Sequence, residues 1–365
     1  MSPTDNRSTA FKRAVIVIGV LVFSAVAWSG FKVWSAWSSV ETVAFDPNAA
    51  RDQLGATSTT STATRTTEAS STTSTATTTT TLTEINHSFL DRGRGNTFLV
   101  IGSDESTTRA DVILLVMLPP SSGDAIIVSI PRDLWVRNPC YGTNTKINAN
   151  LFGCEGPGVS GPEQLAVAIE DFTGVPIDHF VMFTFEGFTQ IIDRVGGVEV
   201  CVGEYPIRDL NRDFDNFTLP AGCSTVDGEA ALSWMRSRKT QQKTDAGWVG
   251  VPNVSDLTRN ERQQDMMLTA LDEMKQIRSL PELQGLVEDI AEAFIIDEGL
   301  GLADVIGLLW DSKTISSDNI YRVALDVRHS FDEVGGAILL LESPFPDAVI
   351  GVYPRAFEFF PDWAG

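Results

Sequence analysis

The stretch TFLVIGSDESTTRADVILLVML, residues 97–118, places two aspartates and an arginine between two apolar runs. The runs at 97–101 and 112–118, with AIIVSI at 125–130, are short, continuous and rich in β-branched residues, as expected of strands covered on both faces. A helical pattern follows at 160–174. The sequence therefore predicts an α/β domain with a mixed central β-sheet and helices on both faces, an αβα sandwich.

Local signals outline the rest of this domain. Ser160 and Glu163 have the spacing of a capping box, and Asp227 and Asp256 are placed to cap two later helices. Further expected elements are strands at 179–185 and 198–202, helices at 186–197, 281–295 and 302–310, and strand-like runs at 321–327 and 347–353. No linker-like composition separates the C-terminal part, so we expect it to complete the same domain.

The N-terminal region predicts a membrane anchor. Residues 14–31 carry no charge and are flanked by basic residues on both sides. A helix rising ~1.5 Å per residue would cross most of a ~30 Å hydrocarbon core over this length. A cleaved signal peptide is the alternative, but the run is long and no small-residue cleavage site follows it. We expect a cytoplasmic segment at 1–13 and a single transmembrane helix at 14–34, with the remainder extracytoplasmic.

A low-complexity segment follows the predicted anchor. Between Thr57 and Thr81 nearly every residue is Ser or Thr, a composition that cannot bury enough apolar surface to fold. We therefore expect a disordered Thr/Ser-rich linker over 35–95, acting as a flexible tether, and a folded extracytoplasmic domain over 96–365.

Four cysteines gain meaning if the domain lies outside the cytoplasm, where disulfides persist. We predict the sequential pairs Cys140–Cys154 and Cys201–Cys223, although the sequence allows three pairings. A zinc site is the competing interpretation, and no Cys-x-x-Cys spacing supports it.

The charge distribution indicates a local anion site. The formal net charge of −21 argues against nucleic acid or an anionic membrane surface as the partner of a broad basic face. Arginines nevertheless recur where elements end or begin. Arg132 follows the strand 125–130, and Arg236 and Arg238 stand at the end of the helix capped by Asp227. Arg259 and Arg262, with Gln263, stand at the start of the helix capped by Asp256. Ordinary salt bridges and helix-dipole interactions are the alternatives. Together the arginines suggest a diphosphate pocket.

Asp104 and Asp111 point to a cation at the same place. They stand at the end of one predicted strand and the start of the next, and two close carboxylates need a cation unless protonated. Oxygen ligands combined with phosphates favour Mg²⁺. The alternative is an ordinary polar turn.

Six blocks together resemble the LytR-CpsA-Psr family of extracytoplasmic phosphotransferases. In the family's order they are GSDESTTRAD (102–111), SIPRD (129–133), KINAN (146–150), DRVGGVEV (193–200), DGEAALSWMRSR (227–238) and DLTRNERQQ (256–264). The resemblance covers the motif core, roughly residues 97–277. It implies that Asp104 and Asp111 share a Mg²⁺ and that the diphosphate of a polyprenyl-linked glycan is bound by Arg109, Arg132, Arg236, Arg238, Arg259 and Gln263.

The resemblance also implies a reaction. The family transfers a glycopolymer phosphate from a polyprenyl-diphosphate carrier at the cytoplasmic membrane to a peptidoglycan hydroxyl during cell-wall assembly. Arg132 would stabilise phosphoryl charge, and Asp133 or another pocket carboxylate would serve as the base. Ser106 stands where family members usually carry an arginine, which implies one missing phosphate contact. Two alternatives stay open: a non-catalytic protein that binds polyprenyl-linked wall polymers, and a hydrolase of the same diphosphate.

Overall fold

The structure is a computed structural model that describes residues 34–58, 95–103, 108–119, 123–210, 217–237, 239–251, 262, 265–266, 269, 293–312, 315 and 317–359. The chain divides into two compact units. Unit 1 contains Met1–Val43, Met182–Ile296 and Val305–Lys313, and unit 2 contains Ala44–Val181, Asp297–Asp304 and Thr314–Gly365. Each unit is described by itself.

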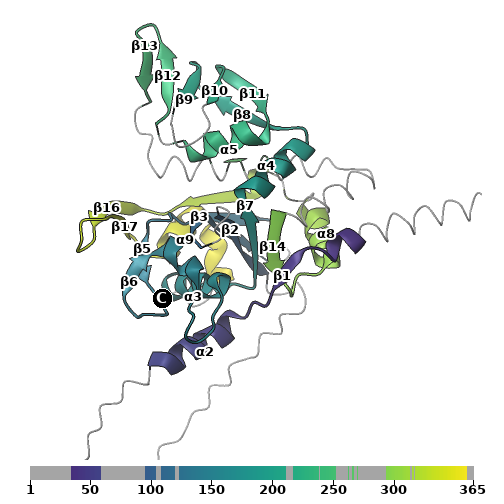
Figure 1. Cartoon of the computed structure of the whole chain (residues 1–365), viewed down its shortest axis with the longest axis vertical. Helices are drawn as coiled ribbons and strands as arrows, with labels where there is room; N and C mark the ends of the chain where they lie inside the picture. The colour runs from purple at the N-terminus through teal and green to yellow at the C-terminus, as the bar shows by residue number, and fades with distance from the viewer. Residues whose placement is uncertain are drawn as a thin grey trace, which may run out of the picture. The chain divides into compact units, whose positions relative to one another are not determined.

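The central sheet of unit 2 is mixed, as predicted (Figure 1). Its strand order is β7-β2-β3-β4-β15, with bounds β2 Asn96–Ser103, β3 Ala110–Leu118, β4 Ala125–Ser129, β7 His179–Thr184 and β15 Ile320–Ala324. β3 pairs antiparallel with β2 and with β4, whereas β15 pairs parallel with β4. Leu99, Ile113, Leu115 and Ile126 are fully buried, because these apolar strands are covered on both faces.

The first predicted helix is α3, Gly161–Thr173. The capping box is present: the Ser160 hydroxyl accepts from the Glu163 N–H, and the Glu163 carboxylate accepts from the Ser160 N–H. Gly174 ends the helix with φ 71°, a left-handed conformation that glycine adopts without strain. Local sequence thus sets both ends of α3.

The segment before the low-complexity tract belongs to the fold, so the prediction of a linker over 35–95 is wrong in its first part. β1, Glu41–Val43, and α2, Pro47–Ser58, both lie inside that range. The rings of Phe45 and Phe180 are 4.9 Å apart, and Leu54 packs in a buried cluster with Val159 and Val167. The few apolar residues of the segment have periodic spacing, a signal that the average composition of 35–95 conceals.

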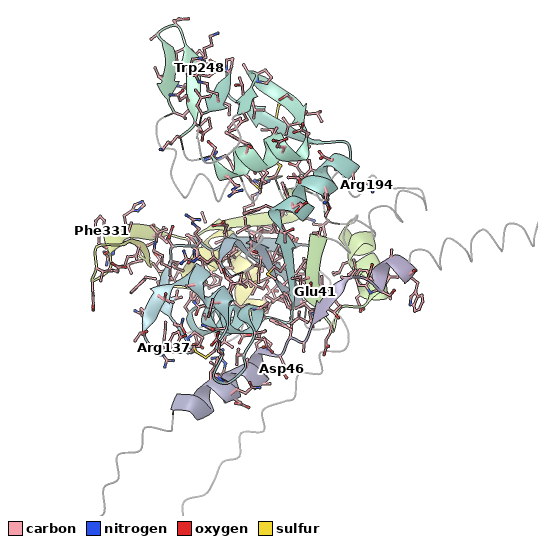
Figure 2. The ribbon with its side chains drawn as sticks, in the orientation of Figure 1. Glu41, Asp46, Arg137, Arg194, Trp248 and Phe331 are labelled. Atoms are coloured by element: carbon pink, nitrogen blue, oxygen red, sulfur yellow. A yellow bond between two sulfur atoms is a disulfide. The ribbon has the colours of Figure 1, made fainter. Side chains whose placement is uncertain are left out.

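Ion pairs reinforce the attachment of α2 to α3. Arg51 binds Glu170 at 2.9 Å and also pairs with Asp171. The backbone N–H of Asp46, labelled in Figure 2, donates to Glu163 at 3.2 Å. Since residues 44–58 and Gly95 both belong to unit 2, the low-complexity tract leaves and re-enters the same folded unit.

Unit 1 is built around two helices, α4 Phe185–Arg194 and α5 Gly228–Arg236, as expected from the sequence. Asp227 caps α5 by accepting from the Ala230 N–H at 2.9 Å. A Cβ atom on Gly228 would lie 2.2 Å from the carbonyl oxygen of Thr189, so the close approach of α4 and α5 requires glycine there.

Short strands complete unit 1. β8, Val198–Val202, pairs antiparallel with β11, Gly222–Val226. A four-stranded sheet has the order β10-β9-β12-β13, with β9 Ile207–Asp209, β10 Phe217–Leu219, β12 Gln241–Thr244 and β13 Gly247–Gly250. The disulfide between Cys201 and Cys223 joins facing residues of β8 and β11, and a second joins Cys140 to Cys154. Both pairs are the predicted ones.

The remaining elements include two departures from the sequence prediction. The remaining elements are β5 Trp135–Arg137, β6 Asn144–Lys146, η1 Ile147–Phe152, β14 Phe294–Asp297, α8 Leu302–Ser312, η2 Ser317–Asn319, β16 Val327–Phe331, β17 Ala337–Leu341, α9 Phe345–Val352 and η3 Pro354–Glu358. The run at 347–353, predicted as a strand, lies mostly in α9, which has Pro346 in its first turn and buries Phe345 and Val349 on one face. The helix predicted over 281–295 does not extend to its end, because Phe294 begins β14.

In the described part of the chain, no helix combines the length and apolarity needed to cross a membrane. The predicted anchor at 14–34 lies outside the described residues except for Trp34, and so does the predicted helix start at Asp256.

Candidate functional site

Four charged residues of unit 2, which we call the charged cluster, come together at one edge of its sheet: Asp111, Arg132, Asp133 and Lys146. Asp111 is the second residue of β3, and Arg132 follows the end of β4. Because β3 and β4 are antiparallel, the start of one lies beside the end of the other. Arg132 Nη1 therefore reaches Asp111 Oδ1 and forms an ion pair with it.

Asp133 lies between two cations. One carboxylate oxygen, Oδ1, is 2.7 Å from Lys146 Nζ, and the other, Oδ2, is 3.6 Å from Arg132 Nε. The side chains of the cluster are between 18% and 35% exposed, so the charges are partly desolvated yet accessible to a ligand. Sequence reasoning singled out Arg132 and Asp133 and included Lys146 only as part of the KINAN block.

Backbone contacts fix these charges in place. The β5–β6 hairpin pairs Trp135 with Lys146, and the N–H groups of Ile147 and Asn148 donate to the carbonyls of Leu134 and Arg132 at 2.8 and 3.2 Å. The Leu339 N–H donates to the Asp133 carbonyl at 3.0 Å. The segment after β4 is therefore held by two separate parts of the chain.

The loop that returns Lys146 to the cluster is also fixed. Cys140 and Cys154 close it covalently. Within it, the Asn138 carboxamide oxygen accepts from the Cys140 N–H at 2.9 Å, and buried Gln164 of α3 donates to Asn138 and Asn150 at 3.2 and 3.1 Å. These buried hydrogen bonds hold the loop against α3, although Gln164 Oε1 has no hydrogen-bond partner among the described residues.

One hydrogen-bond donor of Arg132 is unsatisfied within the described part of the chain. Its Nε is buried and has no hydrogen-bond partner among the residues that the structure describes. Buried donors are normally satisfied, and an exception calls for an explanation such as a ligand. A guanidinium offers five donors in a planar fork that matches phosphate oxygens.

Asp111 could contribute to a cation site. One of its oxygens faces Arg132, and no described residue bonds to the other. The one group of possible metal ligands that the described coordinates bring together is Glu199 with Cys201 and Cys223, whose sulfurs form a disulfide and hold no thiolate. The described part of the site therefore offers one carboxylate oxygen, at Asp111, and Mg²⁺ binds proteins through one or two carboxylates plus substrate oxygens.

In unit 1, Arg236 ends α5, and its guanidinium carbon is 4.8 Å from the centre of the Phe185 ring. Arg262 caps the same helix. Its Nη1 and Nη2 donate to the carbonyls of Trp234 and Ser237 at 3.0 and 2.9 Å, and it lies over the Trp234 ring. Arg262 was expected beside the bound anion, but both of its terminal nitrogens donate to backbone carbonyls at the C-terminal end of α5.

Sequence reasoning missed one residue in this region. Asp209, the last residue of β9, is buried and accepts from the Ser237 hydroxyl at 2.5 Å and from the Lys239 N–H at 3.2 Å. A single aspartate after a short strand carries no local signal of such a role, because its partners are about thirty residues away in sequence.

The predicted site residues thus divide into four groups. Asp111, Arg132 and Asp133 come together in unit 2. Arg109, also in unit 2, is an exposed residue just before β3 and has no hydrogen bond or ion pair with another described residue. Arg236 belongs to unit 1. Four predicted site residues lie outside the described part of the chain: Asp104, Arg238, Arg259 and Gln263.

Comparison with known proteins identifies relatives. The model of the LytR_cpsA_psr family matches residues 56–341. A probable cell wall biosynthesis protein, LcpB of Corynebacterium glutamicum, is 37% identical over 139 residues, covering 38% of this chain and 31% of LcpB. The polyisoprenyl-teichoic acid–peptidoglycan teichoic acid transferase TagT of Bacillus subtilis is 27% identical over 209 residues, covering 57% of this chain and 58% of TagT. The matches thus span less than two thirds of either relative.

Solved structures share the fold. A LytR-Csp2A-Psr enzyme from Actinomyces oris superposes with a TM-score of 0.55 at 26% identity, covering 71% of this chain and 90% of that one. Bacillus subtilis TagV superposes with a TM-score of 0.57 at 21% identity, covering 73% of this chain and 98% of that one. The mixed α/β architecture with a central mixed sheet is common to them.

Proposed function

Because the chain belongs to the LytR_cpsA_psr family, we propose that it is a phosphotransferase of cell-wall assembly. It transfers a glycopolymer phosphate from a polyprenyl-diphosphate carrier to a hydroxyl group of peptidoglycan. The name of TagT, a transferase of teichoic acid from a polyisoprenyl carrier to peptidoglycan, supports this class of donor and acceptor. The same proposal places the folded units at the outer face of the cytoplasmic membrane, behind the predicted anchor.

The arrangement around Arg132 carries the proposal. The acceptor oxygen bonds to the glycan-side phosphorus, the bond from that phosphorus to the bridging oxygen breaks, and polyprenyl phosphate leaves. Negative charge spreads over phosphoryl oxygens in the transition state, and prepositioned donors stabilise it. Arg132 is held by ion pairs to Asp111 and Asp133, and its buried Nε, 3.6 Å from Asp133 Oδ2, has no hydrogen-bond partner among the described residues.

Asp111 would hold a Mg²⁺, together with Asp104. The cation, when bound, neutralises charge on the diphosphate oxygens. Removing it with a chelator should lower transfer, and Asp111→Asn should raise the Mg²⁺ concentration needed for half-maximal rate.

Asp133 acts as a positioning residue in this proposal. Each of its oxygens faces a cation, so it orients Arg132 and Lys146 toward the phosphates, and Lys146 adds a second positive charge. The hydroxyl proton goes to a carboxylate of the pocket, and Asp133 itself and a second pocket carboxylate are the two candidates for this base.

Transfer from a lipid-diphosphate donor to peptidoglycan, measured with the full chain, tests the proposal. Arg132→Ala should reduce the rate by about a hundredfold or more, the range found when a prepositioned donor to the transition state is removed. Arg137→Ala is the matched control, because Arg137 (labelled in Figure 2) is an exposed arginine on β5 that takes part in none of the cluster's ion pairs. Equal rates for both variants would refute the site.

The same assay separates two other functions. A protein that only binds wall polymers would retain the donor without forming product. A hydrolase would release the glycan phosphate into solution with water as the acceptor.

A further inference from the structure

Asp209 of unit 1 anchors a buried polar network. Its side chain is 3% exposed, and its Oδ2 accepts the hydrogen bonds from the Ser237 hydroxyl and the Lys239 N–H. The Ser237 hydroxyl is also 2.7 Å from the hydroxyl of Thr240, and both residues are buried. One carboxylate therefore fixes a side chain and a backbone group on either side of position 238.

Burying the Asp209 carboxylate in this network costs free energy of folding. Asp209 Oδ1 is buried and has no hydrogen-bond partner among the described residues. Burying a charged group with one oxygen unsatisfied costs more free energy than burying a neutral side chain of the same shape. A role beyond stability explains its presence better than stability does.

Arg262 holds the same segment through other atoms. Its bonds to the carbonyls of Trp234 and Ser237 fix the last turn of α5, while Asp209 fixes the residues that follow. In sequence, the segment between Trp234 and Thr240 contains Arg236 and Arg238, the two arginines expected to bind diphosphate. Asp209 and Arg262 thus hold the described residues on both sides of position 238, Ser237 and Lys239, next to Arg236. Of the two, only Arg262 was expected to contact the substrate.

We infer that Asp209 is a positioning residue for the diphosphate-binding arginines at the end of α5. The inference rests on the proposed function, because it takes a lipid-linked diphosphate as the ligand of these arginines. Cationic groups stabilise phosphoryl oxygens effectively only when their position is fixed before binding, since ordering them on binding weakens affinity. Asp209 acts through Ser237 and Lys239 and does not touch the substrate.

Binding of inorganic diphosphate to the full chain, measured by calorimetry, and the KM for the lipid donor test the inference. Asp209→Asn keeps the shape of the side chain but removes its charge, and Ser237→Ala removes the hydroxyl while keeping the carboxylate. Both should raise the diphosphate Kd and the donor KM, by about tenfold for one charge-assisted hydrogen bond. The reference variant is Asp227→Asn, which changes the cap at the other end of α5 and retains a good capping residue.

The outcomes separate the inference from the function on which it rests. A purely structural role for Asp209 would lower Tm in Asp209→Asn and Ser237→Ala without moving Kd or KM, and that result would overturn the inference while leaving the proposed function intact. If Asp209→Asn does not fold, Ser237→Ala decides. A wild-type chain that neither binds diphosphate nor forms transfer product would overturn the proposed function, and the inference with it.

Discussion

Lys146 and Asp133 show how the charged cluster depends on pairs of residues. Their side chains form a direct 2.7 Å ion pair, and Asp133 also faces Arg132. Removing one partner of a partly buried pair leaves the other charge uncompensated, so the effect of a single substitution includes the response of its partner.

A double-mutant cycle should reveal this coupling. Asp133→Asn and Lys146→Met should each lower kcat/KM by about tenfold, and the double variant should be no worse than about the poorer single variant, because both act on one ion pair. Steady-state transfer kinetics measure the three rates. If Asp133→Asn alone abolished activity while Lys146→Met had little effect, Asp133 would be the general base instead.

At this scale the sequence located some of the site. Arg132 and Asp133 were predicted because a charged pair directly after a buried strand stands where α/β sheets place their ligands. Sequence patterns could not decide the role of Lys146, because its contact with Asp133 depends on the β5–β6 hairpin. Asp209 was missed because its partners are distant in sequence and no motif marks it.

Elements of the fold connect these residues to the rest of the chain. The β5–β6 hairpin carries Lys146, and the loop that contains it is closed by the disulfide between Cys140 and Cys154. α2 is attached to α3 through Arg51 and Glu170. Each of these contacts can be removed separately by substitution.

Replacing Cys140 and Cys154 by serine should lower the free energy of unfolding by about 3 kcal/mol, the loop-closure estimate for a ring of this size. Transfer should also slow, because the loop bearing Lys146 loses its closure. Denaturant unfolding and rate measurements below Tm check both effects. Replacing Cys201 and Cys223, which join facing strands of unit 1, should lower stability but slow transfer less. Equal slowing in both variants would contradict a specific role for the first disulfide.

The stability of the fold should depend on pH through Glu170 of α3. Burial raises the pKa of the Glu170 carboxyl above its usual 4.5, although bonds from the Ile177 N–H and Arg51 oppose the shift. The folded protein therefore binds this proton more tightly than the unfolded chain, and stability falls as pH rises through the raised pKa. The difference in unfolding free energy between wild type and Glu170→Gln should thus fall as pH rises from 4.5, as urea titrations would measure. A difference independent of pH would contradict this account, and Glu155→Gln, in an exposed loop, is the control.

Local patterns predicted most elements, and the errors have physical causes. The buried strands β2, β3 and β4 and the capped helices α3 and α5 were predicted because apolar runs and caps act within a few residues. The run at 347–353 was wrong because a short apolar run fits a strand or a buried helix equally well. Phe294 was placed in a helix because the preceding residues have a helical period.

In the whole molecule, α2 lies between the predicted anchor and the low-complexity tract in sequence. The low-complexity tract does not separate the predicted anchor from the folded part, because α2 precedes the tract and packs in unit 2. Composition averaged over 35–95 could not show this. If residues 14–34 cross the membrane, only about ten residues connect them to Phe45, the first core residue of unit 2, so unit 2 lies close to the bilayer that holds the lipid carrier.

Shortening the tract at 59–94 and removing the segment before it should therefore differ strongly in their effect on stability. Reducing residues 59–94 to about half their number should change the unfolding free energy by only about 0.6 kcal/mol, the loop-closure difference for a twofold change in length. Deleting the sequence through Ser58 should destabilise unit 2 strongly, because Phe45 and Leu54 leave its core. Thermal unfolding of the two variants compares them. A truncated protein as stable as the full chain would show that α2 contributes nothing to the fold.

The most direct test of the central claim is the identity of the product. The full chain is incubated with a polyprenyl-diphosphate glycan and peptidoglycan, the wall is digested, and the fragments are weighed by mass spectrometry. The account predicts a muropeptide that carries the glycan through a single phosphate, with polyprenyl phosphate released. A glycan joined without phosphate, or a free glycan phosphate with unmodified peptidoglycan, would contradict it.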